Sequence, residues 1–271
     1  MIDFMVFSRN RALQLYALLE SIEKYIDEKH ISVSVLHRYD DKHVPGLEEI
    51  KNRFSKTDFI EESNFKQHVT DFLGSGNKFC AFLTDDIIFK DNVNIGQVVD
   101  VMESNANVLT FSLRLGLHIK DCYALSSEQP VPMGNVYPPN LFVWDWRQAK
   151  MDWEYPLSVD GHIFRREQIS KWFQPLEYKH PNSFEEIIQT CRKVPDIPPL
   201  AVSFVTSRLV NLPINRVQDT HTNRCGDVGS DVLLGEWNHG KKISISKFHQ
   251  LLNTGVHQEL DIICEDRHGP T

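Results

Sequence analysis

The chain has 271 residues, of which 41% are hydrophobic and 24% charged, and this composition is ordinary for a globular protein that buries a core. The formal net charge of −8 comes without any long run of Lys and Arg. This charge balance argues against a surface that binds polyanions, so we expect no nucleic acid partner, while a local basic pocket remains open.

The sequence shows no pattern typical of export or membrane insertion. The apolar run before Arg9 is too short for the core of a signal peptide and has no basic flank in front. No run approaches the roughly 18 apolar residues of a membrane span, which leaves only peripheral contact with a membrane open. The five cysteines are widely spaced and form no CxxC pair, as is typical of reduced thiols. We therefore expect a cytoplasmic protein.

The first 89 residues alternate between strand and helix patterns. The run 78–89 is apolar on both faces, which is typical of a central strand in a parallel sheet. Repeated strand–helix–strand units predict an α/β fold with a mostly parallel central sheet and helices on both faces. The expected strands are 2–8, 31–41, 57–63 and 78–89, and the expected helices are 11–26, 44–54 and 65–73.

The pattern is less regular after residue 107. The helix expected at 182–194 begins with a capping-box pattern, Ser183 followed by Glu186. No internal repeat, low-complexity tract or linker interrupts the sequence, so we expect one domain, 1–271. The other expected segments are a strand at 107–116, an irregular stretch at 118–156, a strand running into a helix at 156–173, a strand-like run AVSFVTSRLVNL, a polar stretch at 219–231 and a helix-like run at 244–255.

Two adjacent carboxylates, Asp85 and Asp86, stand inside the apolar run 78–89. Adjacent residues of a strand point to opposite faces, so we expect the strand to end or kink here. Ligands of α/β sheets bind beyond the carboxyl ends of the strands, and Mg²⁺ or Mn²⁺ is commonly held by one or two carboxylates plus substrate phosphates. The alternative is a pair of loop acids matched by Lys or Arg.

Ser8, Arg9 and Arg11 follow the first strand and lead into a helix. Backbone amides at such a turn, together with Arg, suit the negative groups of a nucleotide. Solvated residues at a helix start are the alternative. The sequence has no GxGxxG and no GxxxxGK[ST] pattern, which argues against a dinucleotide-binding Rossmann enzyme and a P-loop NTPase.

Four segments in the same order resemble GT-A fold glycosyltransferases of the bacterial, family 2-like kind. The resemblance covers about residues 1–195 and implies a GT-A (Rossmann-like) sheet in a single domain, with a nucleotide-sugar-binding half (1–106) and an acceptor-side half with a C-terminal tail (107–271). The segments are FSRNRALQLYALLESI (7–22), like the opening strand, loop and helix; FLTDDIIF (82–89), like the D-x-D segment; VDGHIFRREQI (159–169), like the acceptor-side strand; and NSFEEI (182–187), like an acidic helix start that supplies the base.

The resemblance assigns roles to the acids near the donor. Thr84 stands where the first Asp of D-x-D belongs, so Asp86 aligns with the metal ligand and Asp85 with the middle position near the donor ribose or sugar. A slip of one residue in the alignment would exchange these two roles. Asp40 and Asp41, at the end of the second strand, match a contact to ribose or base, and a solvated turn is the alternative.

The resemblance also points to a catalytic base at 182–187. Glu186 has another explanation as the capping-box partner of Ser183, which leaves Glu185 to deprotonate the acceptor hydroxyl. Asp160 is the next candidate, either holding the acceptor or acting as the base. Favourable placement of acids at a helix N-terminus is the alternative explanation for both glutamates.

A late histidine often completes the metal shell in the resembling families, and we assign His221 to this role, with a lone surface histidine as the alternative. The pair of His221 and Cys225 is too isolated in the sequence to form a zinc site. Trp144, Trp146 and Trp153 are expected in the core or in a lid, while a stacking platform for a sugar stays open.

Together these expectations describe a metal-dependent glycosyltransferase with Mn²⁺ or Mg²⁺ as cofactor. Its donor would be a nucleotide-diphosphate sugar, with UDP preferred, and a positioned base implies an inverting displacement. The resemblance alone implies that the acceptor is a growing bacterial surface glycan, hence polysaccharide biosynthesis. Two alternatives remain open: a nucleotidyltransferase on a related fold, and a non-catalytic GT-A-like binding domain.

Overall fold

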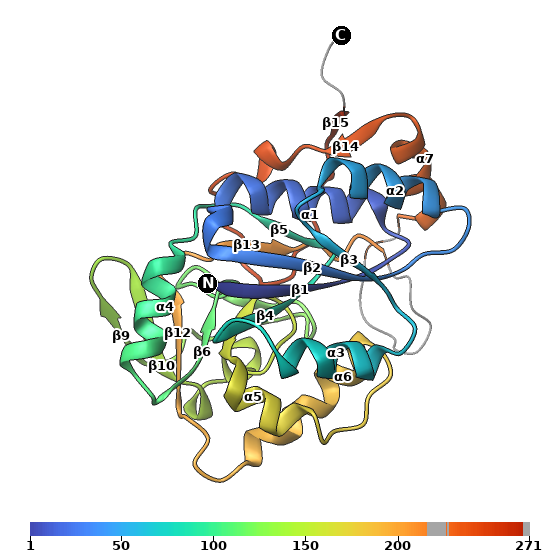
Figure 1. Cartoon of the computed structure of the whole chain (residues 1–271). Helices are drawn as coiled ribbons and strands as arrows, with labels where there is room; N and C mark the ends of the chain where they lie inside the picture. Colours follow the sequence, from blue (N-terminus) through green and yellow to red (C-terminus); the bar gives the residue numbers. More distant parts are fainter. Residues whose placement is uncertain (216–225, 227, 268–271) are drawn as a thin grey trace.

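The computed structural model describes residues 1–215, 226 and 228–267 (Figure 1). A nine-stranded sheet runs through it, in the spatial order β3 (Asp58–Glu61), β2 (Ile31–Arg38), β1 (Ile2–Arg9), β4 (Phe79–Thr84), β11 (His162–Arg165), β6 (Val108–Ser112), β12 (Leu200–Phe204), β10 (Leu141–Asp145) and β9 (Gly134–Tyr137). Only β11 and β10 run against the direction that the other strands share. The predicted α/β class with a mostly parallel central sheet is confirmed.

Helices cover both faces of this sheet (Figure 1). In β1, Phe4 and Val6 pack into one core together with α1, and Met5 and Phe7 pack into the other core together with α3 and α6. β1 is therefore buried on both faces, as its apolar run predicted. The helices on the first face are α1 (Ala12–Tyr25), α2 (Val44–Arg53) and α7 (Ser230–Asn238), with α4 (Ile95–Ser104) packed into the same core, and those on the second are α3 (Phe65–Gly74), α5 (Arg166–Phe173) and α6 (Pro181–Ile188).

Three two-stranded sheets accompany the large one. They are β5 (Ile87–Phe89) with β13 (Leu209–Asn211), β14 (Lys241–Ile243) with β15 (Cys264–Asp266), and β7 (Asp121–Cys122) with β8 (Ser127–Glu128). Two residues separate the end of β4 from the start of β5, so β5 continues the chain away from the carboxyl edge of the main sheet. Within the described ranges, no helix has the length and apolar character needed to cross a bilayer.

The single strand expected at 78–89 is wrong, because the chain forms β4 and β5 in different sheets. The two carboxylates lie in the turn between them, so the strand end expected at this pair is confirmed.

Other differences follow from local chemistry. The expected capping box from Ser183 to Glu186 is wrong: α6 begins earlier, with His180 as N-cap and Pro181 as the first helical residue, where Pro is favoured. The helix also ends earlier, and 189–193 forms a 3₁₀ helix. The run 244–255 contains only a short 3₁₀ helix, and the expectation missed α4 and α7 and the strands β9 and β10 within 118–156.

Candidate active site

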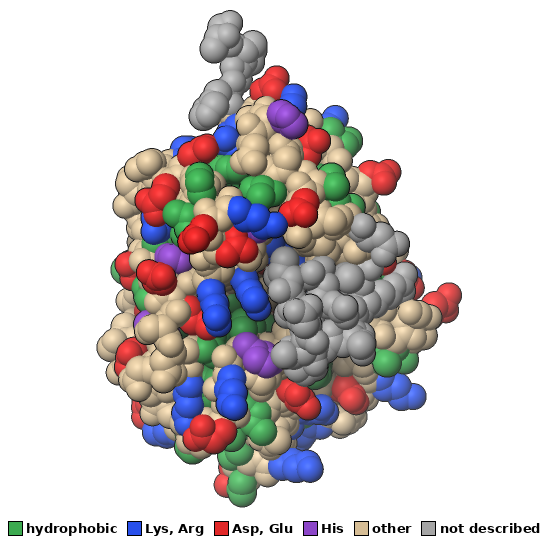
Figure 2. Space-filling model, turned by 90° about the vertical axis from the view of Figure 1, so that its right-hand side faces the viewer, with side chains coloured by type: hydrophobic (Ala, Val, Ile, Leu, Met, Phe, Trp, Pro, Cys, Tyr) green, Lys and Arg blue, Asp and Glu red, His purple; other side chains and the backbone are tan. Residues whose placement is uncertain are grey.

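Asp85 and Asp86 form a turn at the carboxyl end of β4. The N–H of Asp85 donates to the carbonyl of Phe7 in β1 (3.1 Å), after which the chain leaves for β5. The parallel strands point toward this edge, and Figure 2 looks onto it and shows basic side chains gathered near the middle of the face. The two carboxylates therefore end at the edge of the sheet where α/β folds bind ligands.

The carboxylate of Asp85 is held by the loop between β1 and α1. Ser8 Oγ and the N–H of Arg9 donate to its Oδ2 (2.9 and 3.1 Å), and Arg11 Nη1 donates to its Oδ1 (2.9 Å). Asn10 between them has φ of 54°, a left-handed conformation that Asn tolerates, and this turn aims the donors at Asp85. The predicted nucleotide-binding residues of this loop thus meet Asp85, although Arg9 does so through its backbone.

Charge balance in this group depends on Arg11. Burial raises the pKa of Asp85, the guanidinium of Arg11 lowers it, and the charge of Asp86 raises it again. Burial lowers the pKa of Arg11, but the two carboxylates raise it above its ordinary value. Arg11 is therefore the fixed positive charge that allows two adjacent carboxylates to lie at the edge of a hydrophobic core.

Asp86 is the more accessible of the two carboxylates, with a side chain 15% exposed against 4% for Asp85. Its oxygens accept from Arg11 Nη1 (3.3 Å) and from Asn211 Nδ2 in β13 (3.1 Å). The Oδ1 atom of Asn211 is buried and has no hydrogen-bond partner in the part of the chain that the structure describes. Asp86 and Asn211 therefore present oxygen atoms of the kind that Mg²⁺ and Mn²⁺ prefer.

No three His, Cys, Asp or Glu side chains within the described residues lie close enough to hold a metal ion by themselves. His221, the predicted late ligand, lies outside the described residues.

Asp40 approaches the same loop from the end of β2. It exchanges hydrogen bonds with Asn10, whose Nδ2 donates to Asp40 Oδ2 (3.0 Å) and whose Oδ1 accepts from the N–H of Asp40 (2.9 Å). Asp40 Oδ1 lies 2.6 Å from His43 Nδ1, and this hydrogen bond lowers the pKa of Asp40. Asp41 is exposed. The structure thus brings Asp40, and not Asp41, into contact with the first loop.

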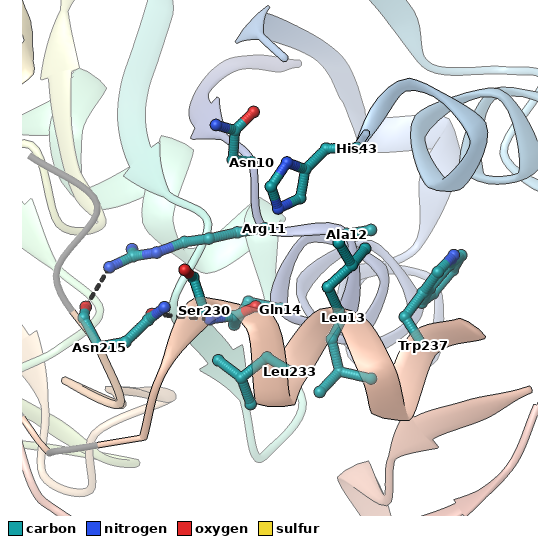
Figure 3. A pocket seen from close by; sticks show the side chains of 11 residues that line it. Asn10, Arg11, Ala12, Leu13, Gln14, His43, Asn215, Ser230, Leu233 and Trp237 are labelled. Atoms are coloured by element: carbon teal, nitrogen blue, oxygen red, sulfur yellow. Dashed lines mark hydrogen bonds between the residues drawn. The ribbon is translucent and has the colours of Figure 1, made fainter. Parts of the chain in front are cut away.

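A small pocket lies behind this loop, between the start of α1 and α7 (Figure 3). Arg11 extends along it and donates to the carbonyl of Asn215, and Gln14 Nε2 donates to Asn215 Oδ1 (3.0 Å). The pocket is also lined by His43 and Trp237. These contacts fix the Arg11 side chain from behind, so that its guanidinium stays on the two carboxylates.

Asp160 lies in a second group of charges, one strand away. Gly161 follows it with φ of 75°, and a side chain there would meet Leu209 at 2.5 Å. Asp160 accepts from Thr84 Oγ1 (2.9 Å) and Arg114 Nη1 (3.4 Å), and it lies 3.2 Å from His257 Nε2. Burial alone would raise the pKa of Asp160, but His257, Arg114 and Thr84 lower it to about 2. Asp160 is therefore a firmly ionised anchor.

Glu185 lies near Asp160 in the first turns of α6. Its Oε1 accepts from Ser158 Oγ (2.9 Å) and from the N–H of Val159 (3.2 Å). Burial and the negative charge of Asp160 raise its pKa. A half-buried carboxylate with a raised pKa is a stronger base than an ordinary Glu, so this environment suits proton transfer.

Thr84 joins the two groups of carboxylates. Its hydroxyl donates to Asp160 and accepts from Asn211 Nδ2 (3.2 Å), and the same amide donates to Asp86. An Asp at position 84 would face Asp160 and lie two residues from Asp86, where a third negative charge is costly. The structure thus gives a physical reason for the residue that departs from the D-x-D pattern.

Two residues of this site, Asn211 and His257, were not predicted from the sequence. Asn211 lies in the strand-like run expected at 201–212, which forms β12 and β13 in different sheets, and nothing in its neighbourhood in the sequence indicates a contact with Asp86. His257 lies far beyond the segments that carry the resemblance. Trp144, Trp146 and Trp153 are buried, and their rings pack in the core, so they offer no platform for a sugar.

Comparison with known proteins supports the predicted resemblance to glycosyltransferases. No family model matches the chain. The bifunctional glycosyltransferase pgtA of Dictyostelium discoideum is 27% identical over 255 residues, which cover 82% of this chain and 33% of that protein. The chain is thus homologous to a glycosyltransferase. The resemblance predicted from the sequence is confirmed, and the chain spans about a third of the length of this curated relative.

Solved structures also resemble parts of the chain at low sequence identity. S. aureus TarS 1–349 in complex with UDP is 13% identical, with 74% of this chain and 60% of that chain covered and a TM-score of 0.47. GalNAc-T7 with UDP, GalNAc and Mn²⁺ is also 13% identical, with 80% and 44% covered and a TM-score of 0.48.

Proposed function

We propose that this chain transfers a sugar from a nucleotide-diphosphate sugar, with UDP as the preferred nucleotide, to a hydroxyl of a glycan acceptor. The observation that carries the proposal is the presence of two clusters of carboxylates at one edge of the sheet. Asp85 and Asp86 form the first cluster, in contact with Arg11, and Asp160 and Glu185 form the second. The first group suits the charged end of a donor and the second suits removal of a proton. The homologous glycosyltransferase supports this assignment.

The donor side is the loop that begins at Ser8. The exposed guanidinium of Arg9 would bind the diphosphate, because a guanidinium compensates phosphate charge. Arg11 would add its positive charge from below while it keeps its contacts with Asp85 and Asp86. Asp85 and Asp40, on either side of the loop, would face the ribose, the base or the sugar of the donor. Ser8 and the backbone of Arg9 would hold Asp85 in place through the hydrogen bonds described above.

The residues beside Asp86 fit a divalent cation, Mn²⁺ or Mg²⁺. Such ions are held by one or two carboxylates plus substrate phosphates and water, and Asp86 is accessible while the buried Oδ1 of Asn211 lacks a partner among the described residues. His221 remains a proposed further ligand. When bound, the cation would supply charge neutralisation for the leaving diphosphate.

The acceptor side supplies the proton acceptor. Glu185 would take the proton of the acceptor hydroxyl while its oxygen bonds to the anomeric carbon and the bond from that carbon to the diphosphate breaks. Asp160 would fix the groups around the acceptor, since its own oxygens already accept from Thr84 and Arg114. One positioned base without a covalent intermediate gives inversion at the anomeric carbon.

The two alternative functions have less support. A nucleotidyltransferase normally carries a glycine-rich phosphate loop at the first turn, and Ser8–Arg11 contains no glycine. A non-catalytic domain would be favoured by Thr84 in place of a metal-binding Asp, but the hydroxyl of Thr84 has a role of its own in the hydrogen bond to Asp160. We also propose a cytoplasmic location, supported by the free thiols of the four described cysteines.

The proposal is tested with a panel of nucleotide sugars, with and without Mn²⁺, by measuring release of the nucleotide diphosphate. We expect hydrolysis or transfer with at least one donor, dependence on the cation, and loss of activity in Asp86→Ala. Asp231→Ala, at an exposed acid on α7, is the matched control and should behave as wild type. Absence of any reaction, or full activity in Asp86→Ala, would contradict the proposal.

A further inference from the structure

His257 lies in the segment between the 3₁₀ helix Ile245–Phe248 and β15, and its side chain contacts Asp160 on the acceptor side. This segment lies beside β13, where the N–H of Asn211 donates to the carbonyl of Val256 and the N–H of Gln258 donates to the carbonyl of Asn211, both at 3.0 Å. Upstream, the buried ammonium of Lys90 donates to the carbonyl of Leu251 (2.7 Å). The backbone around His257 is therefore fixed to the two-stranded sheet of β5 and β13, whose Asn211 also donates to Asp86.

The imidazole of His257 is anchored on one side. Its Nε2 lies 3.2 Å from Asp160 Oδ2, and because an ionised carboxylate can only accept, Nε2 carries the proton of this hydrogen bond. No other hydrogen bond reaches the ring from the residues that the structure describes, and the side chain is 28% exposed. Burial lowers the pKa of His257, but Asp160 raises it above its ordinary value. The outer nitrogen Nδ1 can bind a hydroxyl in either form of the ring, because it donates when the ring is protonated and accepts when the ring is neutral.

The surroundings of this imidazole match the chemistry of a sugar. The ring of Tyr123 stacks on it, with centroids 6.2 Å apart and an interplanar angle of 29°, and the Tyr123 hydroxyl donates to Glu259 Oε1 (2.6 Å). Aromatic faces pack on the apolar faces of sugars while nearby acceptors bind hydroxyl groups. Tyr123 and Glu259 come from different segments, so the aromatic face and the polar edge are brought together by the fold.

The position of His257 separates it from the donor. Its electrostatic partners are Asp160, Arg114 and Asp152, and Glu185 shares the first two of them. The ring of His257 contacts Asp160 directly, so His257 belongs with the charges around the proposed base.

We propose that His257 binds a hydroxyl group of the acceptor sugar through Nδ1, with Asp160 as the positioning residue that fixes its ring. This inference rests on the proposed function and adds an acceptor-binding residue to it. It places Tyr123 at the wall of the same subsite, and it makes donor binding independent of His257.

Two substitutions separate this role from a structural one. In His257→Gln the amide reaches the position of Nε2 and can still donate to Asp160, but nothing replaces Nδ1. In His257→Asn the amide lies near the position of Nδ1, and the contact with Asp160 is lost. A purely structural role predicts that Gln preserves behaviour better than Asn, whereas our proposal predicts the reverse. His30→Gln, at a histidine whose side chain is 56% exposed, is the matched control.

The experiment measures binding of methyl glycosides of glucose, galactose, mannose and N-acetylglucosamine by saturation-transfer NMR, without any donor. We expect at least one glycoside to bind the wild type and His30→Gln alike, and to bind His257→Gln roughly three- to tenfold more weakly, as for loss of one hydrogen bond. UDP should bind all variants equally. Because the assay needs no donor, failure of the proposed function shows separately, as absence of any reaction with nucleotide sugars.

Two results would overturn the inference: equal glycoside binding by the wild type and His257→Gln, or no binding of any of these glycosides by the wild type. If His257→Gln does not fold, the imidazole nitrogen spectrum of the wild type decides instead. A bound glycoside should shift one histidine Nδ1 signal, and a bound glycoside that shifts none would overturn the inference.

Discussion

The donor-side and acceptor-side carboxylates are only a strand apart, yet the protein treats their charges differently. Asp85 and Asp86 share one guanidinium, that of Arg11. Asp160 has Arg114 and His257 as partners, and the pKa of Asp160 falls to about 2, whereas burial and Asp160 itself raise the pKa of Glu185. Pairs of acids whose pKa values are pushed apart are typical of sites that move protons.

The two clusters of carboxylates therefore suit different tasks. Burial raises the pKa of Asp85 above its ordinary value, and the shared guanidinium of Arg11 offsets part of this cost, so this charged cluster suits binding of a cation or a polar ligand. Unequal neighbours leave Asp160 as an anchor and make Glu185 a stronger base.

The largest effect is expected from Glu185→Gln. The amide keeps an acceptor for Ser158 and Val159 but cannot take a proton, so kcat for transfer should fall by roughly 10²- to 10⁴-fold. UDP affinity should not change, because the donor side is intact. Glu186→Gln on the exposed neighbour is the matched control for measured transfer rates. A Glu185→Gln enzyme with wild-type kcat would remove the base from the account.

A large loss of stability is expected from Arg11→Ala. This change leaves Asp85 and Asp86 without their counter-charge at a buried position, so the free energy of unfolding should fall by about 3–5 kcal/mol. Arg9→Ala, at an exposed side chain of the same loop, should cost much less. Urea denaturation of both variants measures the difference, and equal losses would contradict the special role of Arg11.

The pH dependence of stability should separate the two acids of the acceptor side. The pKa of Asp160 is lowered from 3.8 to about 2, so its ionised form stabilises the fold above pH 3.8, and this is lost as the pH falls through 2. The raised pKa of Glu185 has the opposite sign, because its ionised form costs stability at neutral pH and acidification removes that cost.

Two variants measure these opposite signs. Asp160→Asn should be less stable than the wild type at pH 7, with the difference shrinking below pH 3.8. Glu185→Gln should be more stable at pH 7, by something of the order of 1 kcal/mol, with the difference shrinking on acidification. Shifts of the same sign in thermal unfolding at several pH values would contradict the assigned charges.

A further change of stability concerns Thr84, the link between the two groups. Thr84→Asp restores a D-x-D pattern but sets a third carboxylate beside Asp160, so we expect a loss of about 1–3 kcal/mol and no tighter Mn²⁺ binding. Thr84→Ser keeps the hydroxyl and should stay close to wild type. Tighter Mn²⁺ binding by Thr84→Asp in calorimetry would instead show that a metal carboxylate is missing at this position.

Much of the first half was predictable because its elements are local patterns. The apolar runs of β1 and β4 are buried on both faces, and α3 begins at a capping Asn64. α4 was missed although Ile95, Val98 and Met102 share its buried face behind a capping residue, so the signal was present. By contrast, all four residues of β9 are exposed, and no apolar alternation indicates a strand there.

The site was only partly predictable, because its second half depends on distant contacts. The motif at 82–86 predicted the turn, whereas the residues of the first loop were predicted to bind a nucleotide and their contacts with Asp85 were not predicted. The amide of Asn211 and the ring of His257 enter through pairing of β5 with β13 and through the segment beside it, and sequence spacing does not indicate such contacts. The helix start at His180 was hidden by the stronger capping pattern at Ser183.

Calorimetric binding of UDP in the presence of Mn²⁺ tests the central claim most directly, with the wild type, Asp86→Ala and Glu185→Gln compared. The account predicts that the wild type and Glu185→Gln bind UDP equally, and that Asp86→Ala binds at least tenfold more weakly, a difference of about 1.4 kcal/mol. A wild type that does not bind UDP, or an Asp86→Ala variant that binds it as well as the wild type, would contradict the account.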